Sequence, residues 1–261
     1  MNTTLIYAHR GANTKAAENT RGAFDKALAW PIDGIETDIQ LTRDEIAVLW
    51  HDRDLKKLGL PGKRIDDFDF AQLQEMDFAA HFPGAAAEGP MRLDEFIAAY
   101  RSRCRLLLEI KNRDWEDVAR HELKVRQTLA LAGEVSDGRI VFSSFNLGSL
   151  IYAHGIEARS PLVLNLEPEH TVNDARRALD AYPFLHGLCV EISTLDVDMV
   201  GLLRERCKFI AVYTCDSEAE IERALLLGVD VLISDVPQKA LQMRGEKLKN
   251  KITTETQRTP R

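Results

Sequence analysis

Short apolar runs alternate with longer amphipathic segments along nearly the whole sequence, and this alternation limits the possible folds more than any other feature. The short runs have the length of strands, and the amphipathic segments have the spacing of helices. Strands that alternate with helices along one chain predict a parallel α/β architecture.

The segment Gly34 to Leu41 shows the strand pattern most clearly, because apolar and polar side chains alternate with a period of two. The other predicted strands cover residues 5–8, 46–50, 106–110, 140–142, 162–165, 187–192, 209–213 and 229–233. The predicted helices cover residues 18–30, 70–76, 93–100, 115–132, 147–153, 172–181, 196–207 and 218–227, and a last helix begins near Pro237.

About eight such repeats favour a closed (β/α)8 TIM barrel over an open doubly wound sheet, and barrels of about 250 residues routinely form one domain. The chain has 261 residues, so we expect a single-domain α/β barrel over residues 1–244. A short loop-rich insertion is expected at about 52–90, after the second strand region. Residues 245–261 are predicted to form a polar, mobile tail.

The overall charge argues against nucleic acid as a partner, because the net charge is −7 and the pI is about 5.6. The N-terminus lacks the basic and apolar regions of a signal peptide, and no apolar run is long enough to insert stably in a membrane. We therefore expect a cytoplasmic protein. The sequence predicts no oligomeric state.

Chemically reactive side chains follow several of the predicted strands, where the active sites of parallel barrels are built. They are His9 and Arg10 after the first strand, Glu36 and Asp38 on the second, His51 and Asp52 after the short strand that follows, and Glu109 and Lys111 at the end of the next. Each set alone has a purely structural interpretation, as an ion pair, a turn or a strand-end histidine. Their convergence on one end of neighbouring strands favours a shared site.

Glu36 and Asp38 lie two residues apart on a strand, so their side chains point to the same face. The flanking Ile35, Thr37 and Ile39 face the other way, and the apolar ones must pack outward against helices, which directs the carboxylates into the barrel. Two buried carboxylates repel each other and lose hydration, so either a basic side chain or a divalent cation must offset their charge. With Glu109 they offer three hard oxygen ligands, which suit Mg²⁺ or Ca²⁺ better than zinc.

The ordered set of motifs resembles the glycerophosphodiester phosphodiesterase family. The similarity covers about residues 4–240, and its motifs are His9-Arg10-Gly11-Ala12, Glu18-Asn19-Thr20, Gly34-Ile35-Glu36-Thr37-Asp38, His51-Asp52, Glu109-Ile110-Lys111, Ser144-Phe145, Val212-Tyr213-Thr214 and Gly228 to Pro237. Each motif alone is weak, but the ordered set is highly specific.

The resemblance implies a TIM barrel and one divalent metal ion, Mg²⁺ or Ca²⁺, bound by Glu36, Asp38 and Glu109. It implies that His9 and His51 are the general acid–base pair, that Arg10 and Lys111 hold the phosphate, and that Tyr213 packs on the alcohol of a small glycerophosphodiester. The attacking group would be the substrate's own neighbouring hydroxyl, which forms a cyclic phosphate that water then opens.

The sequence departs from the family pattern at three positions. Asp44-Glu45 stands where Asp-Gly is usual, Tyr213 replaces a tryptophan, and Asp216 replaces an asparagine. The last two changes concern the pocket wall and bear on substrate preference. The aromatic side chain at position 213 could instead serve simple core packing. The apolar residues of the 52–90 insertion could cap the pocket or cover the barrel, and covering is the favoured interpretation.

The leading functional hypothesis is hydrolysis of a glycerophosphodiester, such as glycerophosphocholine, to glycerol 3-phosphate and an alcohol. A second hypothesis replaces the substrate with a lysophospholipid, which would need an apolar groove for its acyl chain. A third is a catalytically inactive barrel that serves as a binding module. Loss of a histidine or a metal-binding acid would favour the third, and the sequence retains them all.

Overall fold

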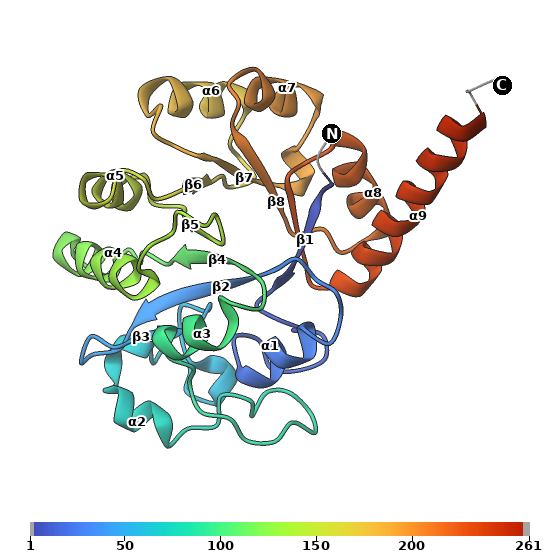
Figure 1. Cartoon of the computed structure of the whole chain (residues 1–261). Coiled ribbons are helices and arrows are strands. Elements are labelled where there is room, and N and C mark those ends of the chain that lie inside the picture. The colour runs from blue at the N-terminus through green and yellow to red at the C-terminus, as the bar shows by residue number, and fades with distance from the viewer. Residues whose placement is uncertain (1–2, 258–261) are drawn as a thin grey trace.

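The computed structural model of the protein describes residues 3–257, in which strands and helices alternate around a ring (Figure 1). The strands are β1 Leu5–His9, β2 Gly34–Leu41, β3 Ala47–Leu49, β4 Arg105–Ile110, β5 Ile140–Ser144, β6 Leu162–Asn165, β7 Gly187–Glu191, β8 Phe209–Tyr213 and β9 Val231–Ser234. The helices are α1 Arg21–Ala27, α2 Phe70–Gln74, α3 Leu93–Tyr100, α4 Val118–Ala132, α5 Leu147–Ile156, α6 Val172–Ala181, α7 Val197–Glu205, α8 Glu218–Leu227 and α9 Pro237–Gln257.

The strands form one closed parallel barrel. The sheet order is β1-β9-β8-β7-β6-β5-β4-β2-β3, and the additional pairing of β1 with β2 closes the ring. Strand β3 lies outside this ring and pairs with β2 in the antiparallel direction. The predicted TIM barrel is therefore confirmed. Within residues 3–257, no helix is long and apolar enough to cross a membrane.

The period-two pattern of β2 determines which side chains enter the barrel. Ile35 and Ile39 are buried in the large cluster between the strands and the surrounding helices. Glu36 and Asp38 point the opposite way, into the lumen, as the alternation predicts. Below them a second apolar cluster fills the barrel and forms the floor of the site; it comprises Tyr7, Leu107, Val141, Val163, Cys189, Ala211, Val231 and Ile233.

The insertion after β3 packs as a separate layer on one side of the barrel. It contains two short 3-10 helices, η1 Lys56–Leu58 and η2 Ile65–Asp67, as well as α2. Its apolar side chains gather around Trp50 and Val48 in a third cluster, whose other buried members are Leu55, Ile65, Leu73 and Phe78. This packing favours the interpretation that the insertion covers the barrel.

The turn between β2 and β3 is made without glycine, as the sequence requires. Glu45 has a φ of 65°, a left-handed conformation that usually favours glycine. Hydrogen bonds around the Thr42 hydroxyl hold the turn, because this group donates to Asp44 and accepts from the Ile46 backbone N–H. Local polar contacts thus replace the conformational freedom of the missing glycine.

Two helices begin three residues later than predicted because of capping. The helix predicted to begin at residue 18 begins at Arg21, since the Thr20 side chain accepts from the Ala23 N–H. The helix predicted from residue 115 begins at Val118, since Asp117 caps it in the same way. Because α1 begins three residues later than predicted, Glu18 and Asn19 lie in a loop that faces the barrel mouth.

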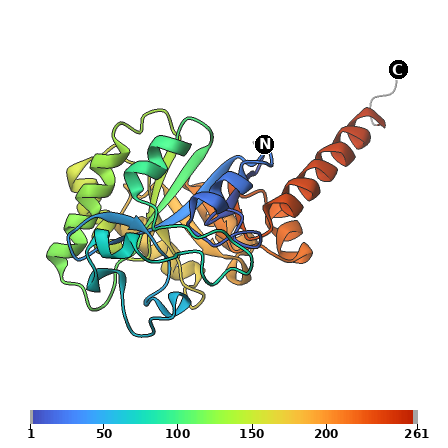
Figure 2. The same cartoon turned by 90° about the horizontal axis from the view of Figure 1, so that it is seen from below.

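Helix α9 extends away from the body of the barrel, as two perpendicular views show (Figure 1, Figure 2). It spans Pro237–Gln257, so residues 245–257 of the predicted tail are helical. The mobility of this segment and the domain boundary at residue 244 stay predictions. Residues 258–261 of the predicted tail lie outside the described part of the chain.

Candidate active site

A pocket of about 160 Å³ opens at the carboxyl ends of the barrel strands. Strands β1, β2, β4 and β8 and the loop after β3 contribute the side chains predicted from the sequence. The residues around the pocket are His9, Arg10, Glu36, His51, Leu107, Glu109, Lys111, Ser143, Phe145, Asn165, Cys189, Tyr213, Thr214 and Ile233. Of the predicted site residues, only Asp38 is absent from this lining, because it is almost completely buried beside Glu36.

Three buried carboxylates meet at the base of the pocket. Glu36, Asp38 and Glu109 each place an oxygen within 4.8 Å of the others, and their exposures are only 3%, 1% and 8%. The parallel register between β2 and β4 causes this convergence, because Asp38 lies directly beside Glu109. Three buried carboxyl groups this close together can all be ionised only beside a compensating cation.

Two basic side chains supply part of the compensation, and both contact Asp38. Lys111 Nζ lies 3.0 Å from Asp38 Oδ1 and also pairs with Glu109. Arg10 Nε lies 3.1 Å from Asp38 Oδ2, to which Asn19 donates a hydrogen bond of 3.0 Å. Burial alone would raise the pKa of Asp38, but Lys111 and Arg10 hold that pKa well below its usual range. Asp38 is therefore ionised at neutral pH.

Glu36 has no comparable partner. Its Oε2 is buried and accepts no hydrogen bond from the residues that the structure describes, and His9 Nε2 lies 3.8 Å away. Burial and the neighbouring Asp38 and Glu109 raise the pKa of Glu36 well above its ordinary value. An orphaned carboxylate beside two others is the donor set of a hard divalent cation, so the site fits the predicted metal ion.

A sharp turn after β1 aims Arg10 at these carboxylates. Arg10 has a φ of 55° and Gly11 a φ of 84°, and the Arg10 N–H donates to the Glu36 carbonyl. A side chain at Gly11 would lie 2.7 Å from the backbone of Ala23, so glycine is required there. The left-handed conformation of Arg10 is strained, and such strain is common where a side chain is held for function.

His9 is oriented by a carboxylate from the last strand of the barrel. Its Nδ1 lies 2.6 Å from Asp235 Oδ1, which also accepts from Asn13. Burial opposes ionisation of Asp235, but the hydrogen bond with His9 lowers its pKa below the ordinary value. An ionised acceptor at Nδ1 favours the tautomer that leaves Nε2 for proton exchange in the pocket.

His51 is oriented in the same way by its sequence neighbour. Its Nδ1 lies 2.9 Å from Asp52 Oδ1, and Arg113 donates to the backbone carbonyls of both residues. The side chain is 34% exposed, so the histidine stands at the mouth of the pocket and not in its base. The site thus contains two histidines, each held at Nδ1 by a carboxylate.

Two aromatic side chains, Tyr213 and Phe145, form part of the pocket wall. Tyr213 donates its hydroxyl to the Leu166 carbonyl at 2.6 Å, and its ring meets Phe145 edge to face at 5.9 Å. Lys111 Nζ lies 5.6 Å from the Phe145 ring centroid. The hydrogen bond fixes the Tyr213 ring in the wall, where it can contact the part of a ligand that lies away from the carboxylates.

A wider groove of about 540 Å³ continues from the pocket past His51 and Lys111. Polar and charged side chains dominate its walls, including Arg53, Asn112, Arg113, His121, Asn146 and Glu167. A ligand in the pocket could therefore extend a polar group into this groove.

The sequence indicated the three acids and two histidines but assigned no role to their supporting residues. Asp235 lies 226 positions from His9, and only closure of β9 against β1 brings the two together. Asn19 was predicted to be helical, but with a φ of 58° it turns back to Asp38. The position of Asp235 directly after the last strand was the available signal, since that strand neighbours the first in a closed barrel.

Replacing Asp235 with asparagine should lower kcat about 100-fold or more with little change in KM. The amide can donate to Nδ1 and so favour the wrong imidazole tautomer, while the size of the side chain is retained. Steady-state kinetics test this expectation, and calorimetric metal titration serves as control because Asp235 is not among the three acids. An unchanged kcat would show that Asp235 does not orient His9 for catalysis.

Comparison with known proteins agrees with the geometry. The sequence profile of the Glycerophosphoryl diester phosphodiesterase family matches residues 9–239. A glycerophosphodiester phosphodiesterase from Bacillus altitudinis is 30% identical over 251 residues, which cover 93% of this chain and 99% of the relative.

Solved structures of the same kind share the fold. An Oleispira antarctica phosphodiesterase, in complex with the product sn-glycerol-3-phosphate, superimposes with a TM-score of 0.77 at 23% identity and covers 94% of this chain and 97% of its own. A glycerophosphodiester phosphodiesterase from Parabacteroides distasonis gives a TM-score of 0.76 at 19% identity. The superposition covers 95% of this chain and 99% of that structure's chain. The chain therefore belongs to the glycerophosphoryl diester phosphodiesterase family, whose members are phosphoric diester hydrolases.

Proposed function

We propose that this protein hydrolyses small glycerophosphodiesters to glycerol 3-phosphate and an alcohol, with one divalent cation bound by Glu36, Asp38 and Glu109. The observation that carries the proposal is the arrangement of the pocket. Two histidines with carboxylate-bound Nδ1 atoms face three buried acids and two basic side chains. Such a set combines proton transfer with stabilisation of a phosphoryl group.

The three acids would hold Mg²⁺ or Ca²⁺, since both cations prefer carboxylate oxygens. When bound, the cation supplies positive charge to the phosphate oxygens as negative charge develops on them. Arg10 and Lys111 line the same pocket and add fixed positive charge beside it. Their contacts with Asp38 hold both cationic groups in place before the substrate binds.

The two histidines would divide the proton transfers. One imidazole takes the proton from the attacking hydroxyl of the substrate, and the other gives a proton to the leaving alkoxide. The Nδ1 atoms are engaged by Asp235 and Asp52, so Nε2 is the exchanging atom in both cases. The attack forms a cyclic phosphate, which water then opens. In this second step the two imidazoles exchange their roles as base and acid.

The dimensions of the site favour a small polar substrate. The pocket of about 160 Å³ lies below the usual range of roughly 300–1,000 Å³ for larger ligands. The adjoining groove is lined mainly by polar side chains and suits a hydrophilic alcohol better than an acyl chain. Tyr213, which lines the pocket, would pack against the alcohol there.

A substrate panel tests the proposal. With Mg²⁺ or Ca²⁺, purified protein should release glycerol 3-phosphate from glycerophosphocholine, and a coupled dehydrogenase assay can measure the product. Lysophosphatidylcholine should react far more slowly. The reverse preference would favour the lysophospholipid hypothesis, and no turnover of either substrate would favour an inactive barrel.

A further inference from the structure

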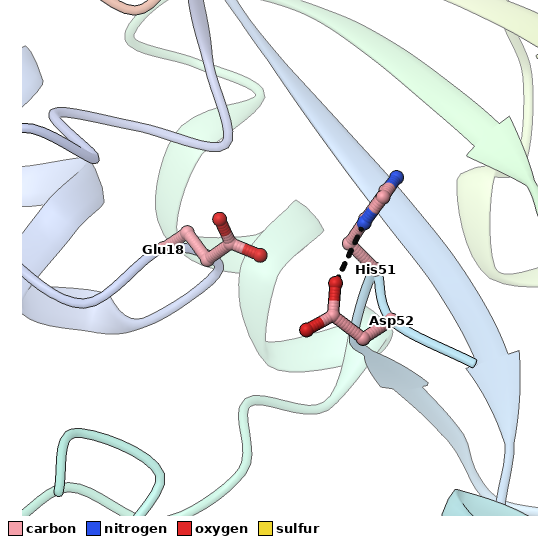
Figure 3. A group of neighbouring side chains, drawn as sticks. All are labelled: Glu18, His51 and Asp52. Carbon is pink, nitrogen blue, oxygen red and sulfur yellow. Dashed lines mark hydrogen bonds and ion pairs between the residues drawn. The ribbon is translucent and has the colours of Figure 1, made fainter. Parts of the chain in front are cut away.

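A second group of side chains that could ligate a metal ion lies on the loops after β1 and β3. It shares His51 with the active site. Glu18, His51 and Asp52 place ligand atoms within 4.8 Å of one another (Figure 3). The ammonium of Lys57 already lies among them, 3.0 Å from Glu18 Oε1 and 3.0 Å from Asp52 Oδ2. The chain therefore supplies its own cation to this cluster.

We infer that Lys57 is a positioning residue that fixes His51 through Asp52, an inference that rests on the proposed function. The carboxylate of Asp52 is shared between two partners. Its Oδ1 binds His51 Nδ1 at 2.9 Å, and its Oδ2 binds Lys57 Nζ at 3.0 Å. Both oxygens are thereby constrained, and the plane of the carboxylate fixes the orientation of the imidazole.

Asp52 and His51 need this support because neither is buried deeply. Their side chains are 28% and 34% exposed, and both residues lie in a loop after β3. Burial opposes the ionisation of Asp52, but the contacts with His51 and Lys57 lower its pKa to about 2. The carboxylate is therefore charged at neutral pH and remains an acceptor for the histidine.

Lys57 itself is held by the fold of the insertion. It lies in η1, and its neighbour Leu55 is completely buried in the cluster of the insertion. The Leu55 N–H donates to the Lys63 carbonyl at 2.7 Å, and the Leu58 N–H donates to the Leu55 carbonyl at 2.8 Å. The packing of the insertion thus determines where the ammonium lies.

The second carboxylate that pairs with Lys57 belongs to Glu18, and it connects the lysine to the other side of the site. Glu18 Oε1 also lies 3.3 Å from Arg10 Nη1, and Arg10 contacts Asp38. A continuous set of ion pairs therefore runs from the insertion to the metal-binding acids. Through Asp52 this set reaches His51, and through Glu18 it reaches Arg10, so the two routes need separate tests.

Lys57→Met should lower kcat roughly 10- to 100-fold with KM within about twofold, because small misplacements of a catalytic group have effects of this size. Lys57→Arg should restore most of the loss. Lys56→Met is the matched control, since Lys56 is exposed and its ammonium makes no ion pair within residues 3–257. A Lys57→Met enzyme with unchanged kcat, or one equal to Lys56→Met, would overturn the inference.

A double-mutant cycle identifies the route. If Lys57 acts through Asp52, Lys57→Met should cost little once Asp52→Asn is present, but should keep its full effect beside Glu18→Gln. If the effects of Lys57→Met and Asp52→Asn on the activation free energy were fully additive, the inference would be overturned.

The ¹⁵N–¹H correlation of the His51 imidazole gives a readout that is independent of substrate. Lys57→Met should shift this signal and Lys56→Met should not, with far-UV circular dichroism used to confirm folding. If the signal shifts but glycerophosphocholine is not cleaved, the proposed function fails and the positioning role stands. An unshifted signal in a folded Lys57→Met protein would contradict the positioning role itself.

Discussion

Glu36→Gln is expected to lower kcat/KM about 1,000-fold or more, a loss typical of removing a major source of transition-state charge stabilisation. The amide retains the shape of the side chain but removes the one carboxylate of the three that forms no ion pair with a lysine or arginine among the described residues. Affinity for Mg²⁺ or Ca²⁺ should fall with activity, and calorimetric titration measures it directly. Glu95→Gln, on the exposed surface of α3, is the matched control and should behave as wild type.

Thermal unfolding separates this effect from misfolding. Burial and the adjacent acids raise the pKa of Glu36 in the folded state. A carboxylic acid whose folded pKa is raised makes its full contribution to stability below its unfolded pKa, and this contribution is lost progressively as pH rises from the unfolded pKa through the folded pKa. At neutral pH and without metal, Glu36→Gln should therefore melt at or above the temperature of the wild type. Lost activity with a lowered melting temperature would instead indicate general damage.

His51→Ala should lower kcat about 1,000-fold while metal affinity stays near that of the wild type. Loss of general acid–base catalysis has effects of roughly 10²–10⁴, and His51 is not among the three buried acids at the pocket base. Kinetics and calorimetry on the same preparation test both parts. Weakened metal binding would make His51 a ligand. His154→Ala, on α5, is the control and should retain full activity.

The pH profile assigns the roles of the two histidines. Wild-type kcat/KM should show a bell-shaped dependence on pH, because one imidazole must be neutral and the other protonated. The variant that loses the acidic limb, either His9→Ala or His51→Ala, lacks the base. A profile that keeps both limbs in both variants would contradict the acid–base pair.

The barrel could be predicted from local patterns because its strands and helices follow simple periodicities. The alternation in Gly34–Leu41 predicted both the strand and the inward direction of Glu36 and Asp38, and the structure confirms both. Element ends were less predictable. The helix predicted from residue 18 begins at Arg21, where Thr20 caps it, and the preceding Asn19 instead contacts Asp38 on β2, a partner distant in sequence.

The supporting residues of the site could not be predicted because their contacts depend on loop conformation. Lys57 reaches Glu18 and Asp52 only after the insertion has packed around Leu55. Asp235 meets His9 only when the last strand closes on the first. Strand periodicity therefore identified the acids on β2, and the assignment of Glu109 depended more on the family resemblance. The contacts of Asp235 with His9 and of Lys57 with Asp52 required the assembled structure.

Metal dependence is tested by the release of glycerol 3-phosphate from glycerophosphocholine before and after complete chelation. If Glu36, Asp38 and Glu109 hold the proposed cation, catalysis requires a divalent metal. EDTA should therefore abolish product release, and excess Mg²⁺ or Ca²⁺ should restore it in the wild type but not in Glu36→Gln. Undiminished release after verified removal of all divalent metal would contradict the proposed metal dependence.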